Sequence, residues 1–157
     1  MKNKTPFLQK EHIYDAPVLY AGLFYLLLAA WTVVSIYLLG TKALKAGGWP
    51  MSQLLMIVFV LAYTWYFSLA IAYKIAVHPD GRVVLTSVRR TLDIPAENIS
   101  MLEGPRLTIL PFGFIRLRLA REKAYLFIMI TDEPLHRVLA ALHRSNPEMK
   151  FKGLPQY

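Results

Sequence analysis

Two uncharged stretches decide the fold of this chain: residues 16–39, APVLYAGLFYLLLAAWTVVSIYLL, and residues 50–73, PMSQLLMIVFVLAYTWYFSLAIAY. Each has 24 residues. As a helix, such a stretch extends about 36 Å at about 1.5 Å per residue, which exceeds the hydrocarbon core of about 30 Å. We therefore expect two transmembrane helices joined by an external loop at residues 40–49, which together form a helical hairpin.

A cleaved signal peptide is the competing interpretation of the first stretch. The segment that precedes it, residues 1–15, contains Glu11 and Asp15, and the apolar run is longer than the run of about 7–15 residues in a signal peptide. Both features favour a retained transmembrane helix.

The charges are unevenly distributed along the chain. The 157 residues carry 18 basic and 10 acidic side chains, and the net charge of +8 divides into +3 over residues 1–73 and +5 over residues 74–157. Outside the two uncharged stretches, the density of charge is that of an ordinary soluble protein. The composition excludes a single soluble domain and a wholly membrane-embedded chain. The absence of cysteine excludes disulfides and thiolate metal sites.

The basic residues near the helix ends predict the orientation in the membrane. Fewer of them lie in the loop than in the two flanks, which contain Lys2, Lys4, Lys10, Lys74, Arg82, Arg89 and Arg90. Because lysine and arginine accumulate on the cytoplasmic side, we expect both termini there. We expect the polar residues inside the spans, such as Thr32, Ser35 and Thr64, to form hydrogen bonds with the other helix or with the backbone of their own helix.

From Lys74 the sequence changes to the alternation of a β-sheet. Strands are predicted at residues 75–77, 83–85, 91–94, 99–102, 107–110, 114–119 and 124–130, with a turn at Pro79-Asp80-Gly81. An amphipathic helix is predicted from Pro134 to Arg144, with capping groups at residues 131–133. We expect residues 74–147 to form a small α+β domain. The tail, residues 148–157, is expected to be disordered or to lie along a neighbour.

The order of these features resembles that of bacterial membrane proteins with a pleckstrin-homology-like domain. The likeness is carried by two apolar helices, by YKIAVHPDGRVVLTSVRRTLDIPAENISMLEG (residues 73–104), and by LHRVLAALHRSNP (residues 135–147). It implies a bacterial inner membrane protein whose seven-stranded, half-open β-barrel is capped by the C-terminal helix. It also implies roles in scaffolding, lipid contact or complex assembly, photosynthetic complexes included. Phosphoinositide-binding members have several basic residues at the first hairpin turn, where this chain has only Arg82.

Six basic residues are candidates for contact with lipid or with a partner protein. Strict alternation puts Arg116 and Arg118 on one strand face, opposite Ile115 and Leu117. The other four are Arg121 and Lys123, at the last hairpin turn, and Arg89 and Arg90. Lipid phosphates and an acidic protein surface are both suitable partners. A solvated strand face, and a topology signal at Arg89 and Arg90, are the alternatives.

No motif for catalysis, cofactor binding or metal binding is present. The four histidines lack the spacing of a ligand set, and the sequence has no phosphate loop, dinucleotide fingerprint or nucleophile motif. We expect a non-enzymatic accessory or assembly subunit of a larger membrane complex, without a cofactor. The alternative is a module that binds or senses anionic phospholipids. The expected partners are other integral membrane subunits and anionic phospholipids, and nucleic acid is not expected.

Overall fold

The computed structural model describes residues 11–45, 51–105 and 111–154. The chain forms two compact units. One consists of residues 18–69 and is helical, and the other combines residues up to Pro17 with residues from Ala70 onward. The sheet unit is therefore assembled from two segments of the chain that lie on either side of the helical unit in sequence.

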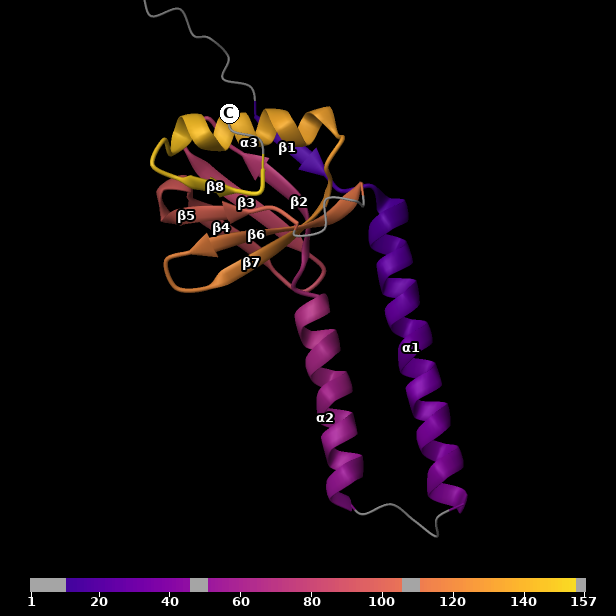
Figure 1. Cartoon of the computed structure of the whole chain (residues 1–157). Helices are drawn as coiled ribbons and strands as arrows, with labels where there is room; N and C mark the ends of the chain where they lie inside the picture. The colour runs from indigo at the N-terminus through magenta and orange to yellow at the C-terminus, as the bar shows by residue number, and fades with distance from the viewer. Residues whose placement is uncertain (1–10, 46–50, 106–110, 155–157) are drawn as a thin grey trace, which may run out of the picture. The chain divides into compact units, whose positions relative to one another are not determined.

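The helical unit contains α1 (Val18–Lys45) and α2 (Met51–Ser68), both visible in Figure 1. By length and composition, both helices are long and apolar enough to cross a membrane. The indole N–H of Trp65 donates to Thr32 Oγ1 (3.0 Å), and the hydroxyl of Tyr25 donates to the Ser68 carbonyl (2.9 Å). Thr32 also donates to the carbonyl of Leu28 in its own helix. The polar side chains thus bond across the hairpin and along the backbone, as expected.

The helix ends differ from the predicted spans 16–39 and 50–73. α1 continues to Lys45, so the first half of the predicted loop 40–49 is helical, because Thr41–Lys45 contain no helix breaker. α2 ends at Ser68, and Ala72 and Tyr73 already belong to a strand. An uncharged stretch is typical both of a membrane-spanning helix and of a buried strand. The absence of charge in residues 50–73 therefore did not distinguish a helix from a strand.

The sheet unit has eight strands, one 3-10 turn and one helix among the described residues. They are β1 (His12–Asp15), β2 (Ala72–Val77), β3 (Arg82–Ser87), β4 (Thr91–Pro95), η1 (Ala96–Asn98), β5 (Ile99–Glu103), β6 (Phe112–Leu119), β7 (Lys123–Met129), α3 (Glu133–Ser145) and β8 (Lys150–Lys152). The predicted strand 107–110 lies outside the described residues. The predicted turn is present, with Gly81 at a φ of +83° and the Asp80 carboxylate accepting from the Arg82 N–H.

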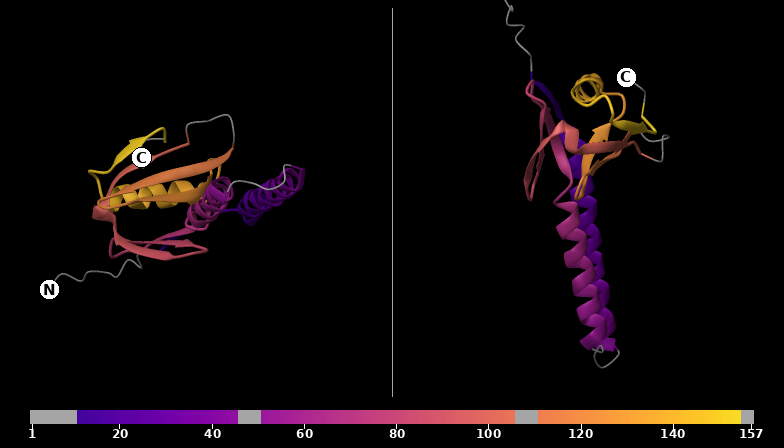
Figure 2. Two further views of the ribbon diagram at one scale, coloured as in Figure 1. Left: turned by 90° about the horizontal axis from the view of Figure 1, so that it is seen from below. Right: turned by 90° about the vertical axis from the view of Figure 1, so that its left-hand side faces the viewer.

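The strands form one open, mixed sheet in the order β4-β3-β2-β7-β6-β5-β8, with β1 added to β2. The contact between β2 and β7 is a single parallel pairing of Ala72 with Leu126, so the sheet opens into two halves at that point. The right-hand view of Figure 2 shows α3 nearly end-on, across the open side between the halves. Its buried stripe of Leu135, Val138, Leu139 and Leu142 closes the core, as the periodicity predicts.

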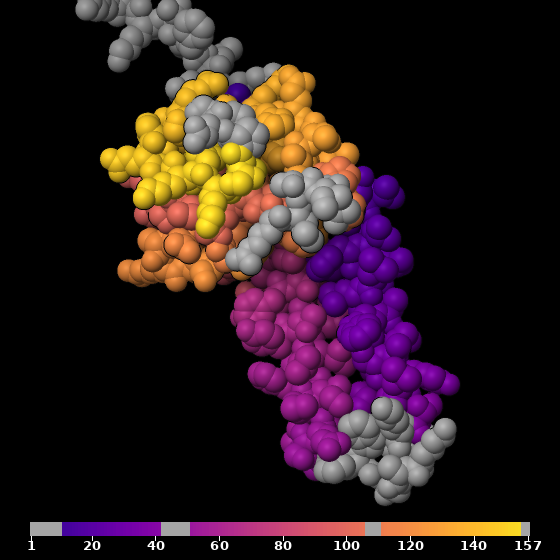
Figure 3. Space-filling model, viewed as in Figure 1, coloured from indigo at the N-terminus to yellow at the C-terminus, as the bar shows by residue number. Residues whose placement is uncertain are grey.

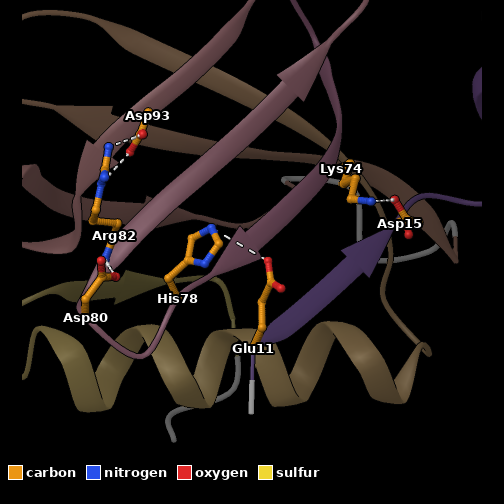
Figure 4. Close-up of polar contacts among 7 residues, drawn as sticks. All are labelled: Glu11, Asp15, Lys74, His78, Asp80, Arg82 and Asp93. Carbon is orange, nitrogen blue, oxygen red and sulfur yellow. Dashed lines mark hydrogen bonds and ion pairs between the residues drawn. The ribbon is translucent and has the colours of Figure 1, made fainter. Parts of the chain in front are cut away.

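β1 pairs antiparallel with β2 along its whole length, from His12 opposite Val77 to Asp15 opposite Lys74. The ladder continues beyond β1, since the N–H of Ala16 donates to the carbonyl of Tyr73 (2.7 Å). Figure 4 shows a side-chain contact at each end of this ladder: Lys74 pairs with Asp15, and the His78 ring lies near the Glu11 carboxylate, each at 3.6 Å. The two segments that enter and leave the helical unit are therefore hydrogen-bonded to each other.

Two chain segments that were not predicted as strands belong to the sheet. Residues 1–15 were expected to be a separate N-terminal segment, and β1 lies within them. Within the predicted tail 148–157, β8 pairs in parallel with β5. Neither segment has a sequence long enough to show alternation, because each strand has at most four residues. At the start of α3, Asp132 occupies the N-cap position, but its side chain makes no capping hydrogen bond.

Tyr14 joins β1 to the core of the sheet unit. Its side chain is 1% exposed, and its hydroxyl accepts a hydrogen bond from the Met129 N–H (2.9 Å) at the end of β7. Burial raises the pKa of the Tyr14 hydroxyl from 10.0 to about 12; the hydrogen bond from Met129 opposes this shift, and the charge of Asp132 adds to it. The neutral hydroxyl is therefore the form that the fold stabilises.

We expect the Tyr14→Phe substitution to lower the free energy of unfolding by about 1–3 kcal/mol, because the buried Met129 N–H loses its acceptor. The pKa of Tyr14 is raised in the fold, so its contribution is complete below pH 10.0 and is lost as the pH rises toward about 12. The difference between wild type and variant should shrink over that range. Denaturant unfolding of the full chain in micelles measures both effects. Tyr73→Phe, at a partly exposed tyrosine, is the control, and equal stability of wild type and Tyr14→Phe at neutral pH would contradict the assignment.

Candidate binding face

The outer surface of the half-sheet β7-β6-β5-β8 carries three of the six candidate residues, Arg116, Arg118 and Lys123. On β6, Ile115 and Leu117 are buried, whereas Arg116 and Arg118 point to the other side, with side chains 28% and 48% exposed. The antiparallel register puts Arg116 opposite Tyr125 and Arg118 opposite Lys123 on β7. Paired residues share a face of the sheet, so these side chains lie on the same surface.

β8 adds two lysines that are not among the six predicted contact residues. Its parallel register puts Lys150 beside Met101 and Lys152 beside Glu103 of β5. The ring of Phe151, between them, faces the other way and meets the His143 ring of α3 edge-on, with a centroid distance of 5.5 Å. Lys150 and Lys152 therefore lie on the outer surface, and both are exposed. Figure 3 shows β8, in yellow, beside the strands of this half-sheet.

The backbone just after β5 lies close to the backbone just after β8. The N–H of Gly104 donates to the carbonyl of Lys152 (2.8 Å), and a Cβ atom at Gly104 would clash with the carbonyl oxygen of Gly153. Gly104 is thus required for the close approach that places the two lysines. The short C-terminal strand gave no sequence signal for this long-range pairing.

We call this surface the basic face, defined by Arg116, Arg118, Lys123, Lys150 and Lys152 around Glu103. Glu103 is the one carboxylate on this surface among the described residues, and its side chain is 17% exposed. It forms a hydrogen-bonded ion pair with Arg116, and its other oxygen lies 3.6 Å from Arg118 Nη2. Two of the five cations, Arg116 and Arg118, are therefore held by the one carboxylate of the face. The Nε of Arg116 is buried and has no hydrogen-bond partner in the described part of the chain.

Aromatic side chains border the basic face. Phe112, Phe114 and Tyr125 are 39%, 37% and 40% exposed, and all three lie on the outer surface by the register of β6 and β7. The ring of Phe114 packs on that of Phe127 at a centroid distance of 5.0 Å. Phe112 and Phe114 are therefore partly exposed rather than buried in the core.

The remaining candidates, Arg89, Arg90 and Arg121, lie in two turns that the fold brings together. Arg90 Nη2 forms an ion pair with Glu122 Oε2 (2.9 Å), which joins the β3–β4 turn to the β6–β7 turn. The β3–β4 turn adjoins Ser87, and Ser87 pairs with Ala72, the first residue of β2. These basic turns therefore lie at the end of the sheet where β2 begins.

The described part of the chain contains no group of three or more histidine, cysteine, aspartate or glutamate residues that could hold a metal ion. No family model matches the sequence, and neither a curated protein nor a solved structure matches it.

We expect Gly104→Ala to detach β8 from β5, because the added methyl group cannot coexist with the Gly153 carbonyl. Trypsin should then cleave after Lys150 and Lys152 about tenfold faster, since cleavage follows local opening. Mass spectrometry of the released C-terminal peptides measures this rate. Gly22→Ala on α1, where a Cβ meets nothing within 4 Å, is the control. Unchanged cleavage after Gly104→Ala would mean that β8 is not held in this way.

Proposed function

We propose that the protein is a non-enzymatic, membrane-anchored accessory or assembly subunit, in which a transmembrane hairpin holds a sheet module at the membrane surface. The observation that carries the proposal is the pairing of β1 with β2. Only Ala16 and Pro17 separate β1 from α1, and three residues separate α2 from β2. Because β1 and β2 are paired, both helices are joined by short connections to one end of one sheet.

This connection constrains the topology of a membrane-inserted chain. If α1 and α2 both cross the bilayer, their sheet-proximal ends lie on the same side, together with the whole sheet unit. The distribution of lysine and arginine favours the cytoplasmic side of a bacterial inner membrane. The short connections of two and three residues leave little freedom to move the module away from the bilayer surface.

The surface of the helices supports a role in assembly. Most of their exposed side chains are apolar, and a groove of about 560 Å³ between them is lined mainly by apolar side chains of both helices. Such helices are suited to contact with lipid or with other transmembrane helices. The order of β2 to β7 followed by α3 supports the resemblance to a pleckstrin-homology-like module. β1 and β8 are additions to the seven strands that the resemblance implies.

A second candidate function is the binding of anionic phospholipids by the basic turns. It is favoured by one observation: the turns that carry Arg89, Arg90 and Arg121 lie at the end of the sheet where β2 begins, three residues after the end of α2. Basic residues next to a membrane span attract anionic lipid, at about 1 kcal/mol for each residue near the surface.

The test of the assembly role is native mass spectrometry of the tagged full chain after extraction in mild detergent. We expect other integral membrane proteins to remain bound in a fixed ratio. A control chain has an Asn-Gly turn in place of residues 18–69, which keeps β1 next to β2. A partner that binds the full chain but not the control chain requires the hairpin for binding. A full chain that is monomeric at every concentration would contradict the proposal.

A further inference from the structure

The cations of the basic face occupy fixed positions in two parallel rows across four strands. One row consists of Lys152, Glu103, Arg116 and Tyr125, and the next of Lys150, Met101, Arg118 and Lys123. Adjacent positions in a row are separated by the distance between strands, about 4.8 Å. The positive charges therefore form an ordered array, set by the backbone register.

Glu103 fixes the two arginines at the centre of this array. Its carboxylate contacts both guanidinium groups, and the Glu103 side chain is itself only 17% exposed. A guanidinium group that is already oriented loses little conformational entropy when it binds a second carboxylate. The planar donors of arginine match a carboxylate in particular, so an incoming acidic side chain suits this arrangement.

Five residues of the face and its border belong to types that are enriched in protein interfaces. Arginine, tyrosine, phenylalanine and methionine are enriched in such interfaces, and this surface combines Arg116 and Arg118 with Tyr125, Phe114 and Met101. Arginine and tyrosine also account for a large share of binding energy. Exposed rings beside the cations provide apolar contact that an array of cations alone lacks.

We propose that the basic face docks an acidic segment of a partner protein, whose carboxylates pair with Arg118, Lys123, Lys150 and Lys152 while its apolar side chains contact Tyr125 and Phe114. The inference rests on the proposed role as an accessory subunit and names the chemistry of its partner. A second copy of this chain is a poor occupant, because its net charge is +8 and a symmetric contact would set the cations against each other. The exposed rings of Tyr125 and Phe114 favour a protein segment, which supplies apolar side chains as well as carboxylates.

The test uses the full chain in phosphatidylcholine nanodiscs and a fluorescent hexaglutamate peptide as the probe. We expect salt-sensitive binding that the double substitution Lys150→Gln/Lys152→Gln weakens about tenfold. Both lysines are exposed, and Arg118→Gln is a second variant that leaves β8 unchanged. The matched control is Arg137→Gln/Arg144→Gln, which removes two exposed charges from α3 and should change the Kd by less than about twofold.

The inference is overturned if hexaglutamate does not bind, or if the variants of the basic face and of α3 have the same affinity. It is also overturned in favour of lipid if the difference between wild type and Lys150→Gln/Lys152→Gln disappears in nanodiscs that contain phosphatidylserine. If the difference persists in these nanodiscs, the result supports an acidic protein segment as the partner. If hexaglutamate does not bind but the full chain still purifies with other membrane proteins, this inference alone is contradicted. A chain that is monomeric in native mass spectrometry contradicts the assembly role instead.

Discussion

The pairing of β1 with β2 joins residues on either side of the whole helical segment, residues 18–69, and the other features of the chain depend on it. It includes four residue pairs, the hydrogen bond from Ala16 to Tyr73 and the buried Tyr14, whose hydroxyl reaches β7. Exposed ion pairs at its ends contribute little. The burial of Tyr14 and the main-chain ladder account for most of its stability. A chain that began at residue 74 would lack β1 and the first residues of β2.

This pairing also links the two proposed roles of the protein. It joins both apolar helices to one end of a sheet, and the parallel contact of β2 with β7 attaches the half-sheet that carries the basic face. The basic turns and the basic face then offer two separate surfaces, one next to the start of β2 and one along β5 to β8. Anionic lipid suits the first, and an acidic protein segment suits the second. The division follows from the position of each surface and from the exposed aromatic rings that border the basic face, because the basic residue types of the two surfaces overlap.

The sequence predicted the parts whose pattern is local. Two apolar helices, the turn at Gly81, the alternation of Arg116 with Leu117, and the stripe of α3 all follow from periodicity or turn chemistry. The end of α2, β1 and β8 could not be predicted in this way. Each is decided by a partner far along the chain: β1 pairs with β2, and β8 pairs with β5. For the same reason Lys150 and Lys152 were missed, and the ion pair of Glu103 with Arg116 depends on the register of β5 with β6.

A disulfide between introduced cysteines tests the β1–β2 pairing most directly, since the chain has no cysteine of its own. Ile13 and Ala76 are opposite each other, and cross-strand Cα distances of about 4.5–5.5 Å lie within the range of disulfides. The account predicts that Ile13→Cys/Ala76→Cys oxidises to an intramolecular disulfide in native membranes. It also predicts that Ile13→Cys/Val84→Cys, with the second cysteine one strand further away, does not. Failure of the first pair to form the bond, or equal yields from both pairs, would contradict the account.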